Sequence, residues 1–278
     1  MRLRIDLAYD GTEFHGWARQ GSLRTVQGTL EAAFDTVLRT SGSTLSVAGR
    51  TDAGVHARAQ VAHLDVDQVT FEAACGSAAE PPALVRRLNG LLDPDLRVHR
   101  VGVAADGFDA RFSASWRRYA YRIADRTDLA DPLTRGHVLA WPRPLDELRM
   151  AAAGRALLGL HDFASFCKRR EGATTIRTLL ELRWERVATG LEATVRADAF
   201  CHHMVRSLVG ALVAVGEGRR EPAWVGEVLS ARERDAAVVV VPAHGLTLEE
   251  VAYPPDAELA GQARAARVVR TLEDKMGS

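Results

Sequence analysis

The sequence predicts an α+β protein made of two halves, each of which mixes strands with helices. Several short segments in both halves alternate apolar and polar side chains, which is typical of half-buried strands. Between them lie longer segments whose apolar residues recur at helical spacing. With 278 residues, 47% of them hydrophobic and 26% charged, the chain has the composition of a globular protein and the length for two domains. We expect halves at 1–106 and 107–255, followed by an Ala/Arg-rich tail at 256–278.

The elements of the first half follow from periodicity and from turn residues. Residues 2–8 alternate apolar and charged side chains and predict a strand, and Asp10-Gly11-Thr12 then turns the chain. Thr25 is a suitable N-cap for a helix that runs from Val26 to Leu38. Residues 67–80 give no clear pattern. We also expect strands at 45–48, 60–66 and 97–103 and a helix from Pro81 to Asn89.

The second half repeats this mixture after a crossover at 107–113. Two neighbouring segments, 176–187 and 191–197, alternate as an antiparallel strand pair would. The other predicted elements are strands at 116–124, 136–141 and 246–251 and helices at 145–158, 202–215 and 223–229.

Composition excludes several classes of protein. No run of about 18 apolar residues occurs, so a membrane span is not expected. The N-terminus lacks an apolar stretch of signal-peptide length, which favours a cytoplasmic location. The three cysteines are scattered and have no CxxC spacing, which argues against a disulfide framework and a zinc site: Cys75, Cys167 and Cys201. Phosphate-binding motifs rich in glycine are absent, so no nucleotide cofactor is expected.

The charges balance, with 36 basic and 36 acidic residues, so composition alone does not indicate a nucleic-acid ligand. However, Lys168 and Lys275 are the only lysines, and arginine grips phosphate with two hydrogen bonds. A genome that favours arginine codons would explain the same bias. Because the arginines gather in clusters, we expect a basic cleft backed by an acidic surface. We expect five of the basic residues to contact the RNA backbone: Arg58, Arg111, Arg118, Lys168 and Arg169.

The segment GRTDAGVHA at 49–57 is the strongest candidate for chemistry. In an extended chain Arg50 and Asp52 point to the same side, and a guanidinium beside a carboxylate favours its ionised form. Gly49 and Gly54 allow a positive φ or a close approach to a ligand. Asp52 therefore reads as a nucleophile or base on a tight turn. The alternative is an Asx-turn residue that only binds its own backbone.

Aromatic residues accompany the arginines in two places. Tyr9, Phe14 and Trp17 flank the first loop, and Tyr119 and Tyr121 share one face of a strand directly after two arginines. Stacking rings beside cationic side chains suit single-stranded nucleic acid. The alternative is that these rings simply fill the core.

The segment FCHHMVRSLVG at 200–210 predicts a helix with one apolar face. Arg206 lies on the edge of that face, where it can project toward a cleft. His202 and His203 are adjacent and would diverge by about 100° on a helix, so a metal site is not expected.

Taken together, these segments resemble the tRNA pseudouridine synthases of the TruA type. The resemblance extends from residue 2 to about residue 253 and keeps the family's order. It comprises YDGTEFHGWARQ at 9–20, RTVQGTLEAAF at 24–34, GRTDAGVHA at 49–57, QVAHLD at 60–65, FDARFSASWRRYAYRI at 108–123, HDFASF at 161–166, FCHHMVRSLVG at 200–210 and PAHGLTL at 242–248.

The resemblance implies a large, mainly antiparallel sheet with helices on one side and a basic central cleft. It implies a homodimer that isomerises uridine to pseudouridine at positions 38, 39 and/or 40 of the tRNA anticodon stem-loop, without metal or organic cofactor. Asp52 matches the catalytic aspartate and Tyr119 the active-site tyrosine. Arg50 and Arg206 match cleft arginines, and Leu246 matches an apolar residue beside the substrate.

Two positions depart from the family pattern: the run NGLLDP at 89–94, which has one residue more before its proline, and Thr247, where a tyrosine is common. Both concern substrate choice rather than the reaction. The main alternative function is a non-catalytic tRNA-binding or remodelling protein. A hydrolase that uses Asp52 and His56 is a more distant one, because it would need a second carboxylate or a metal cluster.

Overall fold

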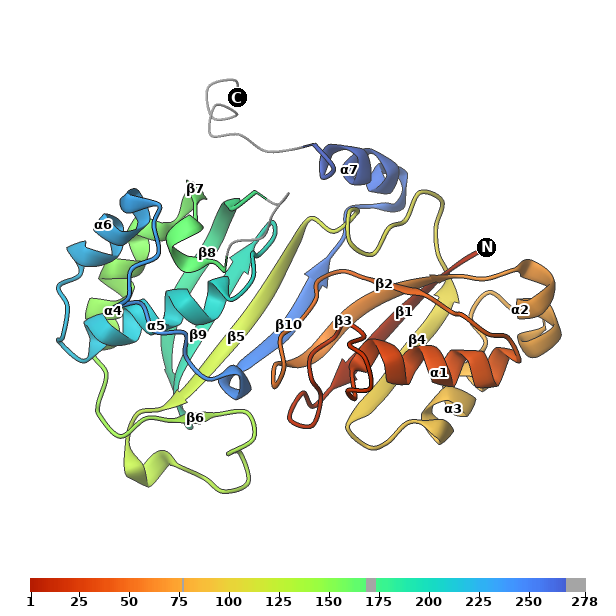
Figure 1. Ribbon diagram of the computed structural model, residues 1–278, viewed down its shortest axis with the longest axis horizontal. Helices are drawn as coiled ribbons and strands as arrows, with labels where there is room; N and C mark the ends of the chain where they lie inside the picture. The colour runs from red at the N-terminus through yellow and green to blue at the C-terminus, as the bar shows by residue number, and fades with distance from the viewer. Residues whose placement is uncertain (77, 169–173, 269–278) are drawn as a thin grey trace. The chain divides into compact units, whose positions relative to one another are not determined.

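The computed structural model describes residues 1–76, 78–168 and 174–268, which form two compact units (Figure 1). Unit 1 consists of Met1–Ser115 together with Leu248–Val268, and unit 2 of Trp116–Thr247. These units describe how the chain packs, and the predicted domain division at 106/107 stays a prediction.

Four strands lie wholly within unit 1 and pair in one sheet: β1 (Arg2–Tyr9), β2 (Leu45–Val47), β3 (His56–Asp65) and β4 (Leu96–Val103). β1 lies between β3 and β4, β2 pairs with the other edge of β3, and all these pairings are antiparallel. The strict alternation of β1 explains its place at the centre. Its apolar residues are buried on one face, and its charged residues lie on the other.

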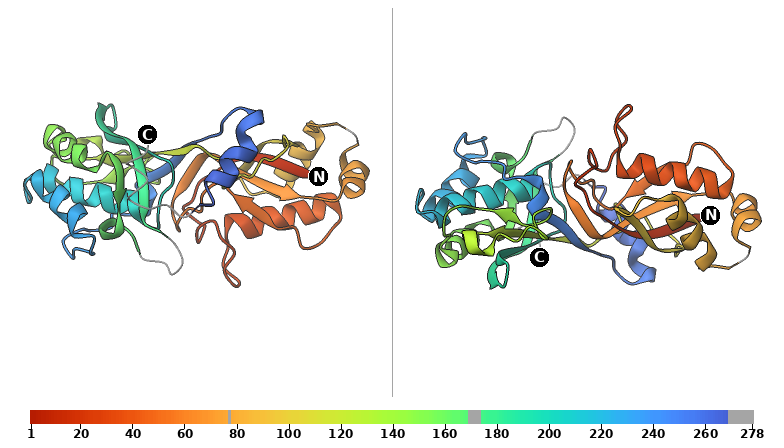
Figure 2. Two further views of the ribbon diagram at one scale, coloured as in Figure 1. Left: turned by 90° about the horizontal axis from the view of Figure 1, so that it is seen from above. Right: turned by 90° about the horizontal axis from the view of Figure 1, so that it is seen from below.

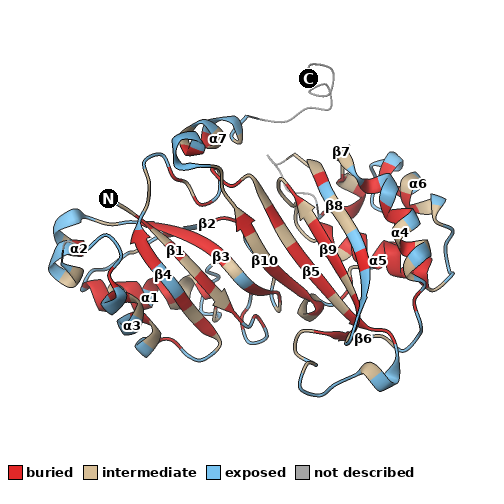
Figure 3. Cartoon of the chain, turned by 180° about the vertical axis from the view of Figure 1, so that it is seen from behind, coloured by how far each residue is buried: buried red, intermediate tan, exposed pale blue. Residues whose placement is uncertain are grey.

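Three helices pack on this sheet and on one another: α1 (Val26–Leu38), α2 (Gln68–Cys75) and α3 (Pro82–Leu91). α1 crosses in front of the strands in Figure 1 and behind them in Figure 3. Thr25 caps α1 by accepting a hydrogen bond from the backbone N–H of Gly28. Leu30 and Phe34 of α1 are fully buried.

The charged face of β1 is covered near Arg4 by residues from the end of unit 1. The Arg4 guanidinium lies 5.6 Å from the ring centre of Phe108 and 5.0 Å from that of Tyr253. α7 (Leu259–Ala265) follows, and Gly107 contacts it so closely that a Cβ there would lie 2.6 Å from the Cβ of Ala260. The predicted tail thus includes a helix, and residues 269–278 lie outside the described residues.

Unit 2 contains a second antiparallel set in the order β5 (Trp116–Ala124), β9 (Gly190–Ala197), β8 (Ile176–Val187) and β7 (Gly159–Asp162). The short strand β6 (Leu139–Ala140) runs parallel to β5. β10 (Leu246–Ala252) begins in unit 2 and ends in unit 1.

Three helices pack on the strands of unit 2: α4 (Glu147–Gly154), α5 (Met204–Gly216) and α6 (Ala223–Ala231). Figure 2 shows them gathered on one side. All residues of α5 except Arg206 are buried. The helix can be buried on every side because its own side chains are otherwise apolar or small.

The α+β class with mainly antiparallel strands is confirmed, whereas several element boundaries are corrected. α2 lies in the segment without a clear pattern, and β7 was not expected. The helix expected at 145–158 ends at Gly154 and continues as a 3₁₀ turn, Arg155–Leu157. The predicted basic cleft stays a prediction.

The inference against disulfide bonding among the scattered cysteines is wrong for one pair. Cys167 and Cys201 form a disulfide, with Cα atoms 5.8 Å apart, and Cys75 is a free thiol. Their separation of 34 residues carries no signal in the sequence, because the fold alone brings them together. Within the described residues, no helix is both long and apolar enough to cross a bilayer.

Candidate active site

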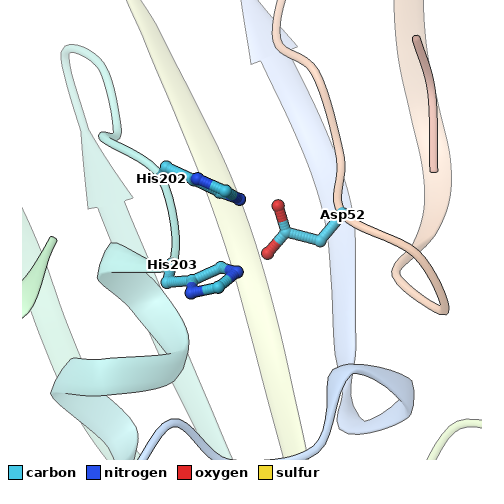
Figure 4. Close-up of side chains that lie close together, drawn as sticks. All are labelled: Asp52, His202 and His203. Carbon is cyan, nitrogen blue, oxygen red and sulfur yellow. The ribbon is translucent and has the colours of Figure 1, made fainter. Parts of the chain in front are cut away.

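Asp52 lies in the loop between β2 and β3, and its side chain projects from that loop half-buried (Figure 4). The Asp52 carbonyl accepts a hydrogen bond of 3.2 Å from the backbone N–H of Val55, so the loop ends in a tight turn. Gly54 has a φ of +78°, as the turn requires. Gly49 has no such φ and a Cβ there would meet open space, so the role expected for it is not needed.

The first loop of unit 1, residues 10–17, holds the Asp52 loop through its backbone. The Gly54 N–H donates to the Phe14 carbonyl over 3.3 Å. Gly11 lies so close that a Cβ would fall 2.1 Å from the Val55 carbonyl oxygen, which only glycine allows. The two loops therefore form one rigid piece.

His56 belongs to this framework. Its ring is buried, and its Nδ1 lies 3.0 Å from both the backbone nitrogen of Gly11 and a carboxylate oxygen of Asp10. The Gly11 N–H donates to Nδ1, which ties the ring to the first loop. This position suits a structural role and does not favour the hydrolase that would use Asp52 and His56.

Arg50 does not form the ion pair with Asp52 that an extended chain would allow. Arg50 is exposed, and among the described side chains it has no ion-pair partner within 4.0 Å. The reason is local: residues 48–54 bend as a loop instead of continuing a strand. Arg58, the third residue of β3, is also exposed, and its guanidinium lies 3.4 Å from the Glu249 carboxylate.

The aromatic residues of the first loop are core residues, which corrects their interpretation as stacking groups. Tyr9, Phe14 and Trp17 are all buried. The rings of Phe14 and Trp17 lie 6.4 Å and 6.2 Å from that of Tyr9. They fill the space beneath the Asp52 loop and give it a fixed base.

In unit 2, Tyr119 and Tyr121 share one face of β5, as their spacing predicts. Both are buried, and Tyr119 packs edge-on against Phe200 with ring centres 5.1 Å apart. The Tyr121 hydroxyl donates to the Pro242 carbonyl over 2.7 Å. Burial raises the pKa of Tyr121, and the positive charge of Arg206 opposes this only in part. Tyr121 is therefore a hydrogen-bonded core residue.

Arg206 extends from α5 to the segment that precedes β10. Its Nε donates to the Val241 carbonyl over 2.7 Å. Gly210, one turn further on, lets this segment approach, because a Cβ there would fall 1.8 Å from the Val239 carbonyl oxygen. Leu246 is the buried first residue of β10. The structure thus brings Arg206, Tyr121 and the segment 241–246 together within unit 2.

His202 and His203 precede α5 instead of opening it, which corrects the predicted start of the helix. Their rings lie 4.0 Å apart at an angle of 52° (Figure 4). His203 has a φ of +67° and is the N-cap residue of α5. A positive φ is uncommon outside glycine, so this conformation could not be predicted from the residue type.

The RNA-backbone candidates are spread over both units. Arg118 lies opposite Arg196 on the face of β5 that faces away from Tyr119, because successive residues of a strand alternate. The exposed Arg111 has its guanidinium 4.9 Å from the ring centre of Phe112. Lys168 is exposed. Arg169 lies outside the described residues.

Unit 1 thus holds a half-buried carboxylate on a loop anchored by backbone hydrogen bonds, with the exposed Arg50 and Arg58 close to it in the sequence. A family model described as tRNA pseudouridine synthase matches residues 153–254. The tRNA pseudouridine synthase A of Streptomyces griseus is 59% identical over 275 residues, which cover 98% of this chain and 95% of that relative. The chain belongs to the tRNA pseudouridine synthase family, which makes it an isomerase and confirms the resemblance found in its sequence.

Two further relatives have the same name. The tRNA pseudouridine synthase A of Frankia casuarinae is 57% identical over 97% of this chain and 96% of that relative. That of Mycobacterium leprae is 50% identical over 98% of this chain and 96% of that relative. The similarity therefore includes both units.

Proposed function

We propose that the protein converts uridine to pseudouridine at positions 38, 39 and/or 40 of the tRNA anticodon stem-loop, with Asp52 as the nucleophile. The relatives that bear the name tRNA pseudouridine synthase A support the substrate and the reaction. The observation that carries the role of Asp52 is its place on a loop held by backbone hydrogen bonds from a second loop. A nucleophile needs such a fixed geometry.

The reaction is balanced without any redox partner. The bond between the ribose C1′ and N1 of uracil breaks, the base turns, and C1′ bonds to C5. C5 then loses its proton and N1 gains one, so the product is an isomer. The Asp52 carboxylate attacks the reacting nucleotide as the first bond is cut, and its bond to the nucleotide breaks again in the course of the rejoining, so that the carboxylate is regenerated. No metal or organic cofactor is needed for these steps.

Residues of unit 2 and the loop arginine have supporting roles in this proposal. Tyr119 stacks on the uracil that leaves the helix, and its hydroxyl helps to take the C5 proton. Leu246 supplies an apolar surface that keeps the detached base from water. Arg50 and Arg206 hold phosphates next to the target. The exposed guanidinium of Arg50 suits this task, since no described carboxylate neutralises it.

Binding must offset the cost of unstacking the target nucleotide, which is a few kcal/mol. Contacts to the RNA backbone supply this free energy. We assign them to Arg58, Arg111, Arg118, Lys168 and Arg169. Because Arg118 lies on the face of β5 opposite Tyr119, it would contact a part of the tRNA away from the target base.

We also infer that the protein is a cytoplasmic homodimer in which each tRNA contacts both subunits. Light scattering coupled to size-exclusion chromatography measures the mass directly. A mass of one 30.2 kDa chain would contradict the dimer.

Pseudouridine mapping of an unmodified tRNA after incubation with the purified protein tests the reaction. We expect pseudouridine at one or more of positions 38 to 40. A tRNA that is bound but unchanged would instead support the non-catalytic tRNA-binding protein, which has no use for a fixed carboxylate.

A further inference from the structure

We propose that Tyr9, Thr51 and Gln60 are positioning residues, whose buried hydrogen-bond network fixes the loop that presents Asp52. This inference rests on the proposed function, because it assigns these residues a purpose in the same reaction. It concerns only unit 1, in which all of the atoms involved lie.

The network grips the loop at two points before Asp52. The hydroxyls of Tyr9 and Thr51 lie 2.8 Å apart, and Thr51 directly precedes Asp52. The Gln60 side-chain amide donates to the Tyr9 hydroxyl over 3.2 Å and to the carbonyl of Gly49 over 2.9 Å. One side chain of the sheet thus holds the start of the loop, and another holds the residue next to the carboxylate.

Both anchoring side chains come from rigid strands. Tyr9 ends β1 and Gln60 lies within β3, and these two strands pair in register from Arg2 to Tyr9 with one bulge. The Gln60 amide oxygen accepts a hydrogen bond of 3.2 Å from the backbone N–H of Val61, which fixes the orientation of the side chain. A site supported from strands is held more precisely than one supported from loops.

The three polar side chains are removed from water. Gln60, Tyr9 and Thr51 have relative exposures of 0%, 5% and 7%. Buried polar groups are costly unless they are paired, and apolar residues of similar size would fill the same space at no such cost. Because the hydrogen bonds lead directly to the residue before Asp52, we assign their purpose to orientation.

The Tyr9 hydroxyl is protonated at neutral pH. Burial raises the pKa of Tyr9 to about 12, although the hydrogen bonds with Thr51 and Gln60 act in the opposite direction. Its ring packs against Phe14 and Trp17 of the first loop, while its hydroxyl reaches the Asp52 loop. Tyr9 therefore joins both loops in one side chain.

Substitution of Thr51 separates the hydroxyl from the volume that it occupies. Thr51→Val removes the hydroxyl and keeps the shape, whereas Thr51→Ser keeps the hydroxyl. We expect Thr51→Val to lower the single-turnover rate at saturating tRNA by about 10-fold, with the Kd for tRNA unchanged. Thr51→Ser should keep most of the wild-type rate, because it keeps the hydroxyl. If Thr51 only filled space, the loss of its methyl group would slow the reaction instead.

Tyr9→Phe removes the same hydrogen bond from its other end, and Tyr253→Phe is the matched control. Tyr253 also lies in unit 1, and its hydroxyl donates to the Ala110 carbonyl over 2.7 Å. Tyr9→Phe should slow the single-turnover rate about 10-fold at saturating tRNA, and Tyr253→Phe should leave it unchanged. The double variant Tyr9→Phe/Thr51→Val should be no slower than the slower single variant, since both lose one shared contact.

The wild-type rate in the same assay separates the two proposals. If the wild-type protein forms no pseudouridine, the proposed function fails. If the wild-type protein is active and Tyr9→Phe is equally fast, only the positioning role is overturned. Should Thr51→Val not fold, as judged by its urea transition, the comparison of Tyr9→Phe with Tyr253→Phe decides. Equal slowing by these two variants would also overturn the positioning role.

Discussion

The backbone N–H of Trp17 donates to the Thr51 carbonyl over 3.0 Å, so the first loop touches the Asp52 loop directly before its carboxylate. Gly16 makes this approach feasible. Its φ is +86°, and a Cβ built on it would lie 2.9 Å from the Thr51 oxygen and 3.1 Å from the nitrogen of Ala53. The first loop therefore contacts the residues on both sides of Asp52.

Gly16→Ala should displace Asp52, because the new methyl group has no room against Thr51. We expect the single-turnover rate to fall by about 100-fold. Gly21→Ala is the control: Gly21 also has a positive φ, +46°, but a Cβ there meets nothing within 4 Å. It should cost only the left-handed strain of about 1 kcal/mol in urea unfolding. Equal rates for the two variants would show that the contact does not matter.

Asp52→Asn should abolish turnover while the Kd for tRNA stays within about 2-fold, because an amide keeps the shape of the side chain and loses the nucleophile. Release of tritium from C5-labelled uridine in tRNA measures the turnover. Asp106→Asn is the same change at an exposed position of unit 1 and should be neutral. Release near the wild-type rate from Asp52→Asn would end its assignment as the nucleophile.

Tyr119→Phe should slow the single-turnover rate by about 10-fold or more, because the ring can still stack while its hydroxyl can no longer assist proton removal. Tyr121→Phe has a different expected effect. It removes the hydrogen bond to Pro242 and should lower the free energy of unfolding by about 1 kcal/mol. An unchanged rate for Tyr119→Phe would exclude its hydroxyl from the mechanism.

The elements with clear periodicity could be predicted from sequence, and those without it could not. β1 alternates over its whole length, and Thr25 is a standard N-cap residue, so both were predicted nearly to the residue. α2 has a single fully buried residue, Phe71, and therefore no apolar stripe to detect. β7 has only four residues, all of intermediate burial.

Within the candidate site, the sequence motif predicted the turn at Asp52 but not what holds it. Tyr9, the shared partner of Thr51 and Gln60, lies 42 and 51 residues before them in the chain, so only the fold brings the three together. One signal was available: Gln60 is a polar residue at the start of an apolar strand segment. Arg118 and Tyr119 are neighbours in the sequence, which suggested a joint role. Because successive side chains of a strand point to opposite faces, the two lie on different faces of β5.

The ion pair between Asp125 and Arg186 should stabilise unit 2. Asp125 is fully buried and accepts two hydrogen bonds from Arg186, of 2.7 Å and 2.9 Å, whereas the Arg186 side chain is 41% exposed. Asp125→Asn should lower the free energy of unfolding by about 2 kcal/mol, below the cost of breaking a fully buried pair because water reaches the arginine. Asp128→Asn, which breaks an exposed pair with Arg126, should leave the free energy of unfolding nearly unchanged.

The same pair sets a dependence of stability on pH. Burial alone would raise the pKa of Asp125, but the hydrogen bonds from Arg186 and from the Leu145 N–H outweigh it and lower the pKa. The ionised form therefore stabilises the folded state above pH of about 4, and this contribution is lost as the pH falls further. Urea unfolding of the wild-type protein and Asp125→Asn should converge toward acid pH. A constant difference would contradict this origin.

The affinity for tRNA should fall steeply with salt concentration, because bound phosphates displace counterions. Arg58→Ala and Lys168→Ala should each weaken binding and reduce the slope of log K against log salt by about 1. Arg126→Ala is the control, because Arg126 is an exposed arginine outside the proposed set of RNA contacts. Filter binding between low and moderate salt measures the slopes, and a flat dependence for the wild-type protein would contradict phosphate contacts.

Unit 1 is completed by residues 248–268, which follow the whole of unit 2 in the sequence. The Ser113 hydroxyl lies within hydrogen-bond distance, 3.1 Å, of the Leu259 carbonyl, and Phe108 packs against Tyr253 with ring centres 5.0 Å apart. Residues 248–268 complete a unit whose other part ends at Ser115, so unit 1 cannot form all of its contacts until the chain of unit 2 has been made. The loop that carries Asp52 therefore rests on a unit held together by contacts that are distant in the sequence, and such contacts form more slowly than local ones.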